Sequence, residues 1–258
     1  MSLVRVEGLV LRTKELGEAD RIVTLLTKQQ GKIRTAARGA RRGRSALSAV
    51  CQPFAHGSYL IYMSKRSLHS INQGELVRPF RRLREDLVCL AYAAYFAELT
   101  DLCLPEEEPN DTVFDLLSTA FNWLEQGTGR FAVFARWFEL HLIDLVGFRP
   151  ELESCIHCRS GLNPNLTAAS LGFSIDGGGI VCNDCISEQA SAHRINGAVW
   201  KSMRYLLAAA PTRLDVFHPT KPVVEAMAHL LQSYIEYRFE KRIQALTFLQ
   251  SVVSIPEA

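Results

Sequence analysis

The sequence predicts an α+β multidomain fold with a small N-terminal β-barrel or sandwich, followed by a helical domain with a four-cysteine, zinc-ribbon-like insertion. Short β-rich runs separated by glycine fill the first 80 residues, and apolar residues at steps of three and four follow Pro79. Two Cys-x-x-Cys motifs interrupt the helical pattern. The expected domains are the barrel at 1–80, the helical domain in two parts at 81–149 and 191–258, and the zinc-binding insertion at 150–190.

Five strands are expected in the first domain, at residues 3–13, 20–30, 31–39, 54–63 and 67–77. Each run is rich in β-branched and apolar residues and is bounded by glycine or polar residues. Five strands in fewer than 80 residues are typical of a small barrel or sandwich.

Helical periodicity follows, at residues 83–97, 114–124, 134–145, 196–207 and 223–249. Gly147, with Pro150 just beyond it, is the expected stop signal of the third helix. The Cys-, Gly- and Asn-containing segment between the third and fourth helices indicates an insertion that is stabilised in its own way.

The charge is distributed unevenly along an otherwise ordinary chain. The 258 residues are 48% hydrophobic and 22% charged, which excludes disordered and fibrous classes. The formal net charge is only +2, but residues 1–84 hold 17 Lys and Arg against 5 Asp and Glu, whereas residues 85–258 hold 12 against 22. This split predicts two regions with different partners.

No signal peptide is expected, because no long apolar stretch follows the first charged residues, and the longest nearly apolar run, 87–97, is about half the roughly 20 residues that a membrane helix needs. We therefore expect a cytoplasmic protein without a membrane partner. Seven cysteines, an odd number, do not indicate a secreted disulfide framework.

The four-cysteine cluster predicts one structural Zn²⁺ per chain. Cys155 and Cys158 form the first motif, Cys182 and Cys185 the second, and 23 residues separate them. Four thiolates close a tetrahedral site and leave no position for water or substrate. A reducible dithiol pair, metal-free buried thiols, and His157 in place of one sulfur are the alternatives. Arg149, Arg159 or Arg194 could offset the charge of −2 on a four-thiolate zinc site.

A basic segment in the first domain is the candidate nucleic-acid surface. Seven positive charges and no acid occur between residues 28 and 44. Strand parity projects Lys32, Arg34 and Arg38 from one face. The expected DNA-binding residues are Lys32, Arg34, Arg38, Arg41, Arg42 and Arg44, followed by Lys65, Arg66, Arg81, Arg82 and Arg84. The alternative is a solvated charged face.

Aromatic rings in the same domain have two interpretations. Phe54, Tyr59, Tyr62 and His69 are available for base stacking on single strands. Because they alternate with apolar neighbours in strands, they are more simply explained as filling the barrel and its rim.

Enzymatic motifs are absent. The sequence has no G-x-x-x-x-G-K-[ST], no G-x-S-x-G and no H-E-x-x-H. The acidic run from Glu106 to Glu108 lies between two prolines and is expected to be a solvated interhelix loop. We therefore predict no catalytic residues and no enzyme.

Several stretches resemble the bacterial recombination mediator RecO family. The similarity is carried by GLVLRTKELGEADRIVTLLTKQQGKIRTAARGARRGRSAL, QPF, FARWFELHLIDLVGFRPELESC and the two Cys-x-x-Cys turns in this order. The resemblance implies an OB-fold barrel, a central helical domain and a zinc element that only some members retain. The glycine that often follows the first cysteine pair is Arg159 here.

The resemblance also implies a function in DNA repair and recombination. Members bind single- and double-stranded DNA, anneal complementary strands, contact the acidic C-terminal tail of single-stranded DNA-binding protein, and help to load RecA with RecR and, in some pathways, RecF. Such a protein would associate with the nucleoid during repair.

The partner contact with the acidic tail is expected on one helix. A cation beside an apolar groove suits such a tail, and the helix offers Arg130 and Arg136 beside Phe134 and Trp137. The alternative is a core helix with two solvated arginines.

A transcriptional regulator that reads DNA with its zinc element is the alternative function. The segment 150–190 contains one Lys or Arg, Arg159, against five Asp and Glu residues. A groove-reading element is expected to be basic, so the sequence favours the mediator.

Overall fold

The computed structural model describes the chain except residues 1, 44, 66, 163–170, 189–190 and 254–258. Two compact units form: the first contains residues 1–129 and 243–258, and the second contains residues 130–242. The architecture is mixed α+β with an N-terminal β-domain, which confirms the predicted fold class.

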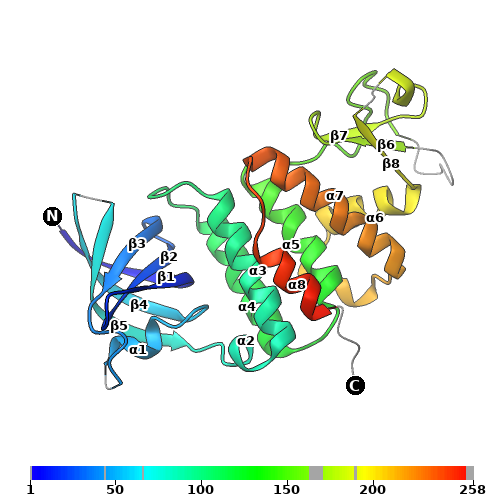
Figure 1. Cartoon of the computed structure of the whole chain (residues 1–258). Helices are drawn as coiled ribbons and strands as arrows, with labels where there is room; N and C mark the ends of the chain where they lie inside the picture. The colour runs from blue at the N-terminus through cyan, green and yellow to red at the C-terminus, as the bar shows by residue number, and fades with distance from the viewer. Residues whose placement is uncertain (1, 44, 66, 163–170, 189–190, 254–258) are drawn as a thin grey trace. The chain divides into compact units, whose positions relative to one another are not determined.

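The first unit begins with a closed five-stranded barrel (Figure 1). Its strands are β1 (Ser2–Leu16), β2 (Asp20–Thr27), β3 (Gly31–Ala37), β4 (His56–Met63) and β5 (Leu68–Arg78), in the spatial order β1-β2-β3-β5-β4. β3 and β5 run parallel and the other neighbours antiparallel. The expectation of a barrel or sandwich is thus resolved in favour of an OB-like barrel.

The barrel interior is filled by alternate residues of its strands. Val23 and Leu25 of β2, Ile33 of β3 and Tyr59 of β4 are almost fully buried in one apolar cluster. The short helix α1 (Leu47–Val50) joins this cluster, and the Tyr59 hydroxyl donates to its Val50 carbonyl at 2.8 Å. This helix therefore anchors the connection between β3 and β4.

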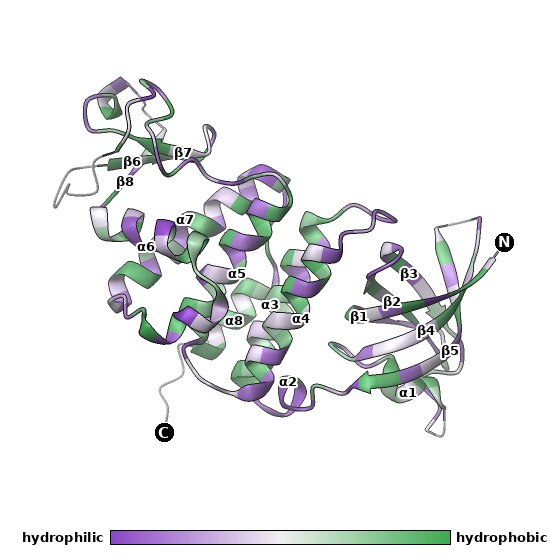
Figure 2. Ribbon diagram, turned by 180° about the vertical axis from the view of Figure 1, so that it is seen from behind, coloured by the Kyte–Doolittle hydropathy of each residue, from purple (hydrophilic) through white to green (hydrophobic). Residues whose placement is uncertain are grey.

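Four helices complete the first unit: α2 (Arg82–Glu85), α3 (Leu87–Cys103), α4 (Asp111–Gln126) and α8 (Ala245–Val253). Asp86 caps α3 and Asn110 caps α4 through their side-chain oxygens, as N-cap preferences predict. The loop between α3 and α4 is hydrophilic, and it is mainly purple in Figure 2. α8 packs on α3, where the Glu98 carboxylate accepts hydrogen bonds from the Gln244 and Ala245 N–H groups.

The helical run expected at 223–249 is divided in the structure. Helix α7 (Lys221–Phe239) ends at Glu240, whose φ of 52° is left-handed, and α8 begins five residues later. The apolar spacing continues across this break, so periodicity alone could not locate it. The consequence is that α8 belongs to the first unit, whereas α7 belongs to the second.

The second unit combines helices with a small sheet. It contains α5 (Phe131–Leu145), α6 (Gly197–Ala208), the 3-10 helix Pro211–Val216 and α7, together with β6 (Leu171–Ser174), β7 (Gly179–Val181) and β8 (Ala192–Ile195). The sheet order is β7-β6-β8. Trp200 of α6 is fully buried and donates to the Leu152 carbonyl at 2.8 Å, which attaches the insertion to the helices.

Among the described residues, no helix is both long enough and apolar enough to span a membrane.

Candidate nucleic-acid interface and metal centre

The predicted alternation along β3 is correct. Ile33 and Ala37 face the apolar barrel interior, whereas Arg34 between them is partly exposed on the outside. Arg38 follows the strand and is exposed. The basic side chains of β3 therefore do share the outer face.

Lys32, however, is not available on that face. Only 8% of this residue is exposed, its Nζ lies 3.0 Å from Oδ1 of Asp101, and it also donates to the Asp101 carbonyl. Arg12 of β1 donates to the other carboxylate oxygen at 2.6 Å. The expectation that Lys32 contacts DNA needs correction, because the end of α3 covers this part of the strand.

The loop after β3 presents three described arginines, of which one is held in place. Arg41 donates to the Gly17 carbonyl at 2.8 Å and pairs with Glu15 at 3.0 Å. Arg38 and Arg42 are exposed and make no ion pair within the described part of the chain. Arg44 lies outside the described residues.

The β4–β5 hairpin lies beside the exposed part of β3. Register places Leu68 opposite Arg34, and Ser70 between Ala36 of β3 and Tyr62 of β4. Leu68 is 37% exposed and Tyr62 is 42% exposed. Lys65 is exposed at the hairpin tip, and Arg66 lies outside the described residues. We define the open face as the set Arg34, Arg38, Arg42, Tyr62, Lys65 and Leu68.

The basic group at the barrel–helix junction is mostly bound within the protein. Arg84 is half-buried and donates to the Pro53 and Pro79 carbonyls, and burial lowers the pKa of its guanidinium. Arg82 pairs with Asp86 at 3.6 Å, whereas Arg81 is exposed without an ion pair among the described residues.

Three of the four candidate stacking rings are structural. Phe54, Tyr59 and His69 are each at most 4% exposed. Tyr59 belongs to the apolar cluster of the barrel, as expected, whereas Phe54 packs against Phe121 of α4. His69 links two segments, because its Nδ1 accepts from the Ser64 N–H at 3.1 Å and its Nε2 lies 3.1 Å from a Glu107 carboxylate oxygen. Tyr62 alone presents its ring at the surface.

The expected partner helix is part of the core. In α5, Phe134 is 1% and Trp137 4% exposed, and the indole donates to the Ala209 carbonyl at 2.8 Å. Arg136 is buried against Glu139, and Arg130 donates to two backbone carbonyls near residue 214. The expectation that these four residues form a partner surface is wrong, because three of them are buried and the partly exposed Arg130 is held by backbone carbonyls.

Negative charge is concentrated more sharply than the two-part charge split indicates. Residues 85–129 contain ten Asp and Glu and no Lys or Arg, whereas residues 130–258 contain twelve of each sign. The excess acid therefore belongs to α3, α4 and their loop, in the same unit as the basic barrel, and not to the zinc-type insertion. A finer window along the sequence would have revealed this distribution.

The four predicted metal ligands converge in the second unit. The sulfur atoms of Cys155, Cys158, Cys182 and Cys185 all lie within 4.8 Å of one another. The Cys158 and Cys182 sulfurs are 3.7 Å apart, close to the roughly 3.8 Å edge of a tetrahedron with metal–sulfur bonds of about 2.3 Å. His157 is outside the cluster and lies 3.8 Å from Glu188 instead. The cluster fits a metal ion without a histidine ligand.

Hydrogen bonds prepare part of the cluster for thiolate charge. The Ser160 hydroxyl and N–H lower the pKa of Cys158 to about 6. Burial opposes ionisation of Cys155, but N–H groups of residues 182, 158 and 157 lower its pKa. Burial raises the pKa of Cys182, and hydrogen bonding to Cys182 raises that of Cys185. A bound cation would therefore be needed to ionise all four thiols together.

Comparisons with known proteins cover nearly the whole chain. Residues 1–80 match the family model for the Recombination protein O N terminal, and residues 84–247 match that for the Recombination protein O C terminal. The DNA repair protein RecO of Symbiobacterium thermophilum is 35% identical over 98% of this chain and 99% of its own length. Those of Bacillus velezensis and Bacillus subtilis are 41% and 40% identical, each over 72% of this chain and 70% of their own length. The chain therefore belongs to the RecO family of DNA repair proteins.

Proposed function

We propose that this RecO-family protein binds single- and double-stranded DNA on the open face of its barrel and anneals complementary strands. The observation that carries the proposal is the open face itself, where Arg38, Arg42 and Lys65 make no ion pair with any residue that the structure describes and lie on a barrel that also exposes Tyr62. Arg41 supports this surface indirectly by holding the loop against Gly17 and Glu15.

The chemistry of annealing fits a protein without catalytic residues. Cations that neutralise two phosphate backbones reduce the repulsion between strands, and base pairing then supplies the sequence specificity. No nucleotide hydrolysis is needed. In this proposal the protein acts as a recombination mediator, not as an enzyme or a transcriptional regulator.

Charge reversal tests the DNA surface. The variant Arg38→Glu/Arg42→Glu should lose annealing, and its affinity for a single-stranded oligonucleotide should fall at least tenfold. The slope of log affinity against log salt should become shallower by roughly 0.7 per lost phosphate contact. Lys201→Glu/Arg213→Glu is the matched control, because both residues are exposed in the second unit. Unchanged annealing in the first variant would refute the proposed surface.

We propose that the four cysteines hold one structural Zn²⁺. Four sulfur ligands leave no open coordination position, so the ion would stabilise the insertion and not take part in a reaction. Metal analysis of the purified protein should give one zinc per chain, and Cys182→Ser should lower this content. Chelation should unfold the insertion and leave DNA binding by the barrel intact. Loss of DNA binding with intact folding would instead implicate the zinc element.

The family context further supports RecR, RecA and the acidic tail of single-stranded DNA-binding protein as partners. In some pathways RecF is a further partner.

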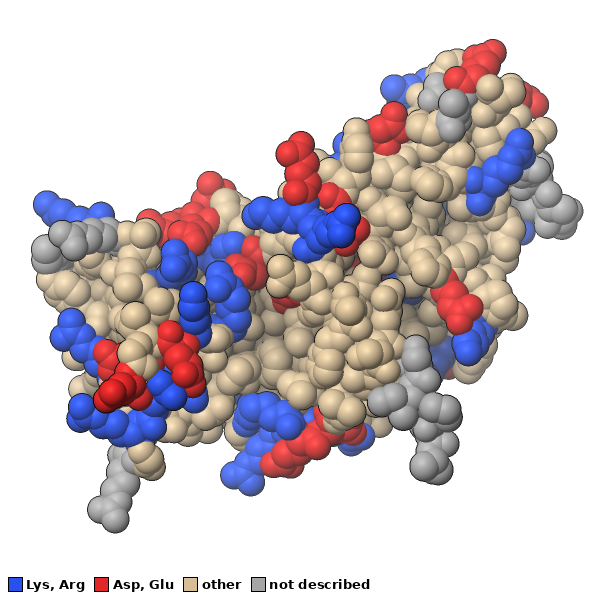
Figure 3. Space-filling model, viewed as in Figure 1, with Lys and Arg blue, Asp and Glu red and all other residues tan. Residues whose placement is uncertain are grey.

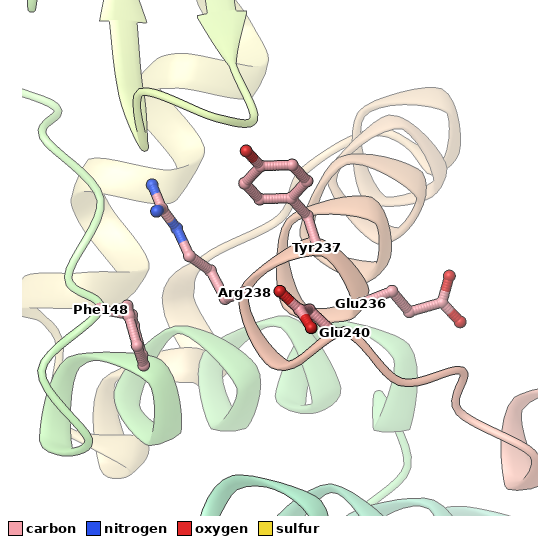
Figure 4. A pocket seen from close by; sticks show the side chains of 5 residues that line it. All are labelled: Phe148, Glu236, Tyr237, Arg238 and Glu240. Carbon is pink, nitrogen blue, oxygen red and sulfur yellow. The ribbon is translucent and has the colours of Figure 1, made fainter.

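Two pockets of the second unit differ in their suitability for an acidic peptide. The pocket of about 460 Å³ at the end of α7 contains Arg238 but also Glu236 and Glu240 (Figure 4). A pocket of about 430 Å³ between β8, α6 and α7 is lined by Arg194 and His229 and has no described carboxylate in its lining.

We therefore propose the second of these pockets for the acidic tail. Its floor includes the buried Val199 and Leu230, so it offers apolar surface beside a cation. Arg194→Glu should weaken binding of a tail peptide in calorimetry, whereas Arg238→Glu should not. The opposite ranking would assign the tail to the α7 pocket.

A further inference from the structure

The acidic segment 85–129 is fixed against the barrel. Phe121 of α4 makes edge-to-face contacts with Phe54 at 5.6 Å and with Phe80 at 5.8 Å between ring centroids. Phe114 of the same helix packs against His56 at 6.0 Å. Because these rings are buried, the ten carboxylates of this segment are carried by a rigid part of the first unit.

The loop between α3 and α4 extends to the edge of β3 (Figure 1). The Glu107 N–H donates to the Lys32 carbonyl at 2.9 Å, and the Glu107 carboxylate contacts His69 of β5. Gly31 lies so close to this loop that a Cβ would be 2.1 Å from the Glu108 carbonyl oxygen. The loop is therefore attached to both β3 and the strand beside it.

The carboxylates of the segment have different surroundings. Asp101, Asp115 and Glu107 contact barrel cations or His69, whereas Glu106 and Glu108 are exposed and make no ion pair among the described residues. Figure 3 shows acidic side chains over this loop, close to basic ones on the barrel. Lys32, which the loop contacts, is two residues or about 7 Å along β3 from Arg34 of the open face.

We infer that Glu106 and Glu108 form an acidic boundary that excludes nucleic acid from one side of the barrel and confines the strand to the open face. The exposed carboxylates at this edge repel phosphates. Asp101 and Asp115 already neutralise the barrel cations with which they pair. The inference rests on the proposed function, since it specifies where on the barrel the DNA backbone can run.

The experiment measures oligonucleotide affinity of the full-length chain over a range of salt concentrations. Glu106→Gln/Glu108→Gln should raise affinity about threefold near 0.1 M salt and by less at higher salt, where the repulsion is already screened. The slope should therefore steepen only slightly, because no phosphate contact is added. Glu106→Lys/Glu108→Lys should also steepen the slope by roughly 1.4, because phosphates then reach two new cations.

The controls separate this inference from a general charge effect and from the proposed function. Asp215→Gln/Glu240→Gln and Asp215→Lys/Glu240→Lys change the net charge equally at exposed sites of the second unit. Equal gains in these controls, or no gain in the loop variants, would overturn the boundary. Failure of the unaltered protein to bind any oligonucleotide would refute the proposed function instead. Circular dichroism verifies that each variant is folded.

Discussion

The two outer faces of the barrel carry the same sign of charge in different surroundings. On the covered face, Arg12 and Lys32 meet Asp101, and Lys28 lies 3.2 Å from Asp115. On the open face, Arg38 and Arg42 have no such partner among the described residues. Cations of the first kind attach helices to the barrel, whereas cations of the second kind are available to a phosphate backbone.

This difference shows why a charge count along a chain is a poor guide to a binding surface. The first 84 residues have seventeen Lys and Arg, but several of them are neutralised by the forty-five residues that follow. Whether a cation stabilises the fold or can bind DNA depends on whether a carboxylate pairs with it, and not on the total number of Lys and Arg residues. Substitutions on the covered face should therefore change unfolding, and those on the open face should change DNA affinity.

The largest effect is expected from Asp101→Ala. This change leaves the Lys32 amine, with 10% of its side chain exposed, without its carboxylate. We expect the free energy of unfolding to fall by about 2–3 kcal/mol, below the range for a fully buried pair because Asp101 is 19% exposed. Urea denaturation measures it. The double variant Asp101→Ala/Lys32→Met should recover part of the loss; no recovery would argue against an unpaired amine as the cause.

Gly31→Ala should destabilise the same face by about 2 kcal/mol. The φ of 66° is unfavourable for alanine, and the added Cβ would also collide with the Glu108 carbonyl. Gly17→Ala is the matched control, because Gly17 has a φ of 60° and its Cβ would meet nothing within 4 Å. Thermal unfolding should show a smaller loss for Gly17→Ala. Equal losses would show that the collision contributes nothing.

The sequence predicts features that depend on neighbouring residues much better than those that depend on distant ones. The five strands and most helices follow from local periodicity, and the four cysteines follow from their spacing. The inward and outward alternation along β3 is also local. The burial of Lys32 is not, because Asp101 is 69 residues away and no local pattern pairs the two.

The same limit explains the error in α5. Aromatic residues beside arginines in Arg130–Phe138 are compatible with a groove and with a core helix. Burial against Ala209 and the 3-10 helix near residue 214 decides between them. Conversely, Asp101 and Asp115 were missed as barrel partners, although the absence of Lys and Arg from 85–129 could have indicated a segment that binds cations.

Acid should weaken the covered face. Burial opposes ionisation of Asp101, but hydrogen bonds and charge from Arg12 and Lys32 outweigh it and lower its pKa. A carboxylate with a lowered pKa stabilises the folded state above the unfolded pKa of about 4, and this contribution is lost as the pH falls further. The effect should be smaller than that of Asp101→Ala, since the neutral acid still fills its site. The unfolding free energy of Asp101→Asn should depend less on pH below 4 than that of the unaltered chain.

The smallest effect is expected from the open face, at Tyr62. Its ring is exposed beside Ser70 of β5 and one strand from β3, where a base can stack while its phosphate meets a cation. Tyr62→Ala should lower affinity for single-stranded oligonucleotides about fivefold, the lower end of the range for one stacked base. The salt slope should stay constant, because no phosphate contact is lost. Tyr62→Phe should retain affinity, since stacking needs the ring and not the hydroxyl. A clear loss of affinity in Tyr62→Phe, or a changed salt slope in Tyr62→Ala, would mean that the tyrosine positions the neighbouring cations and does not contact a base.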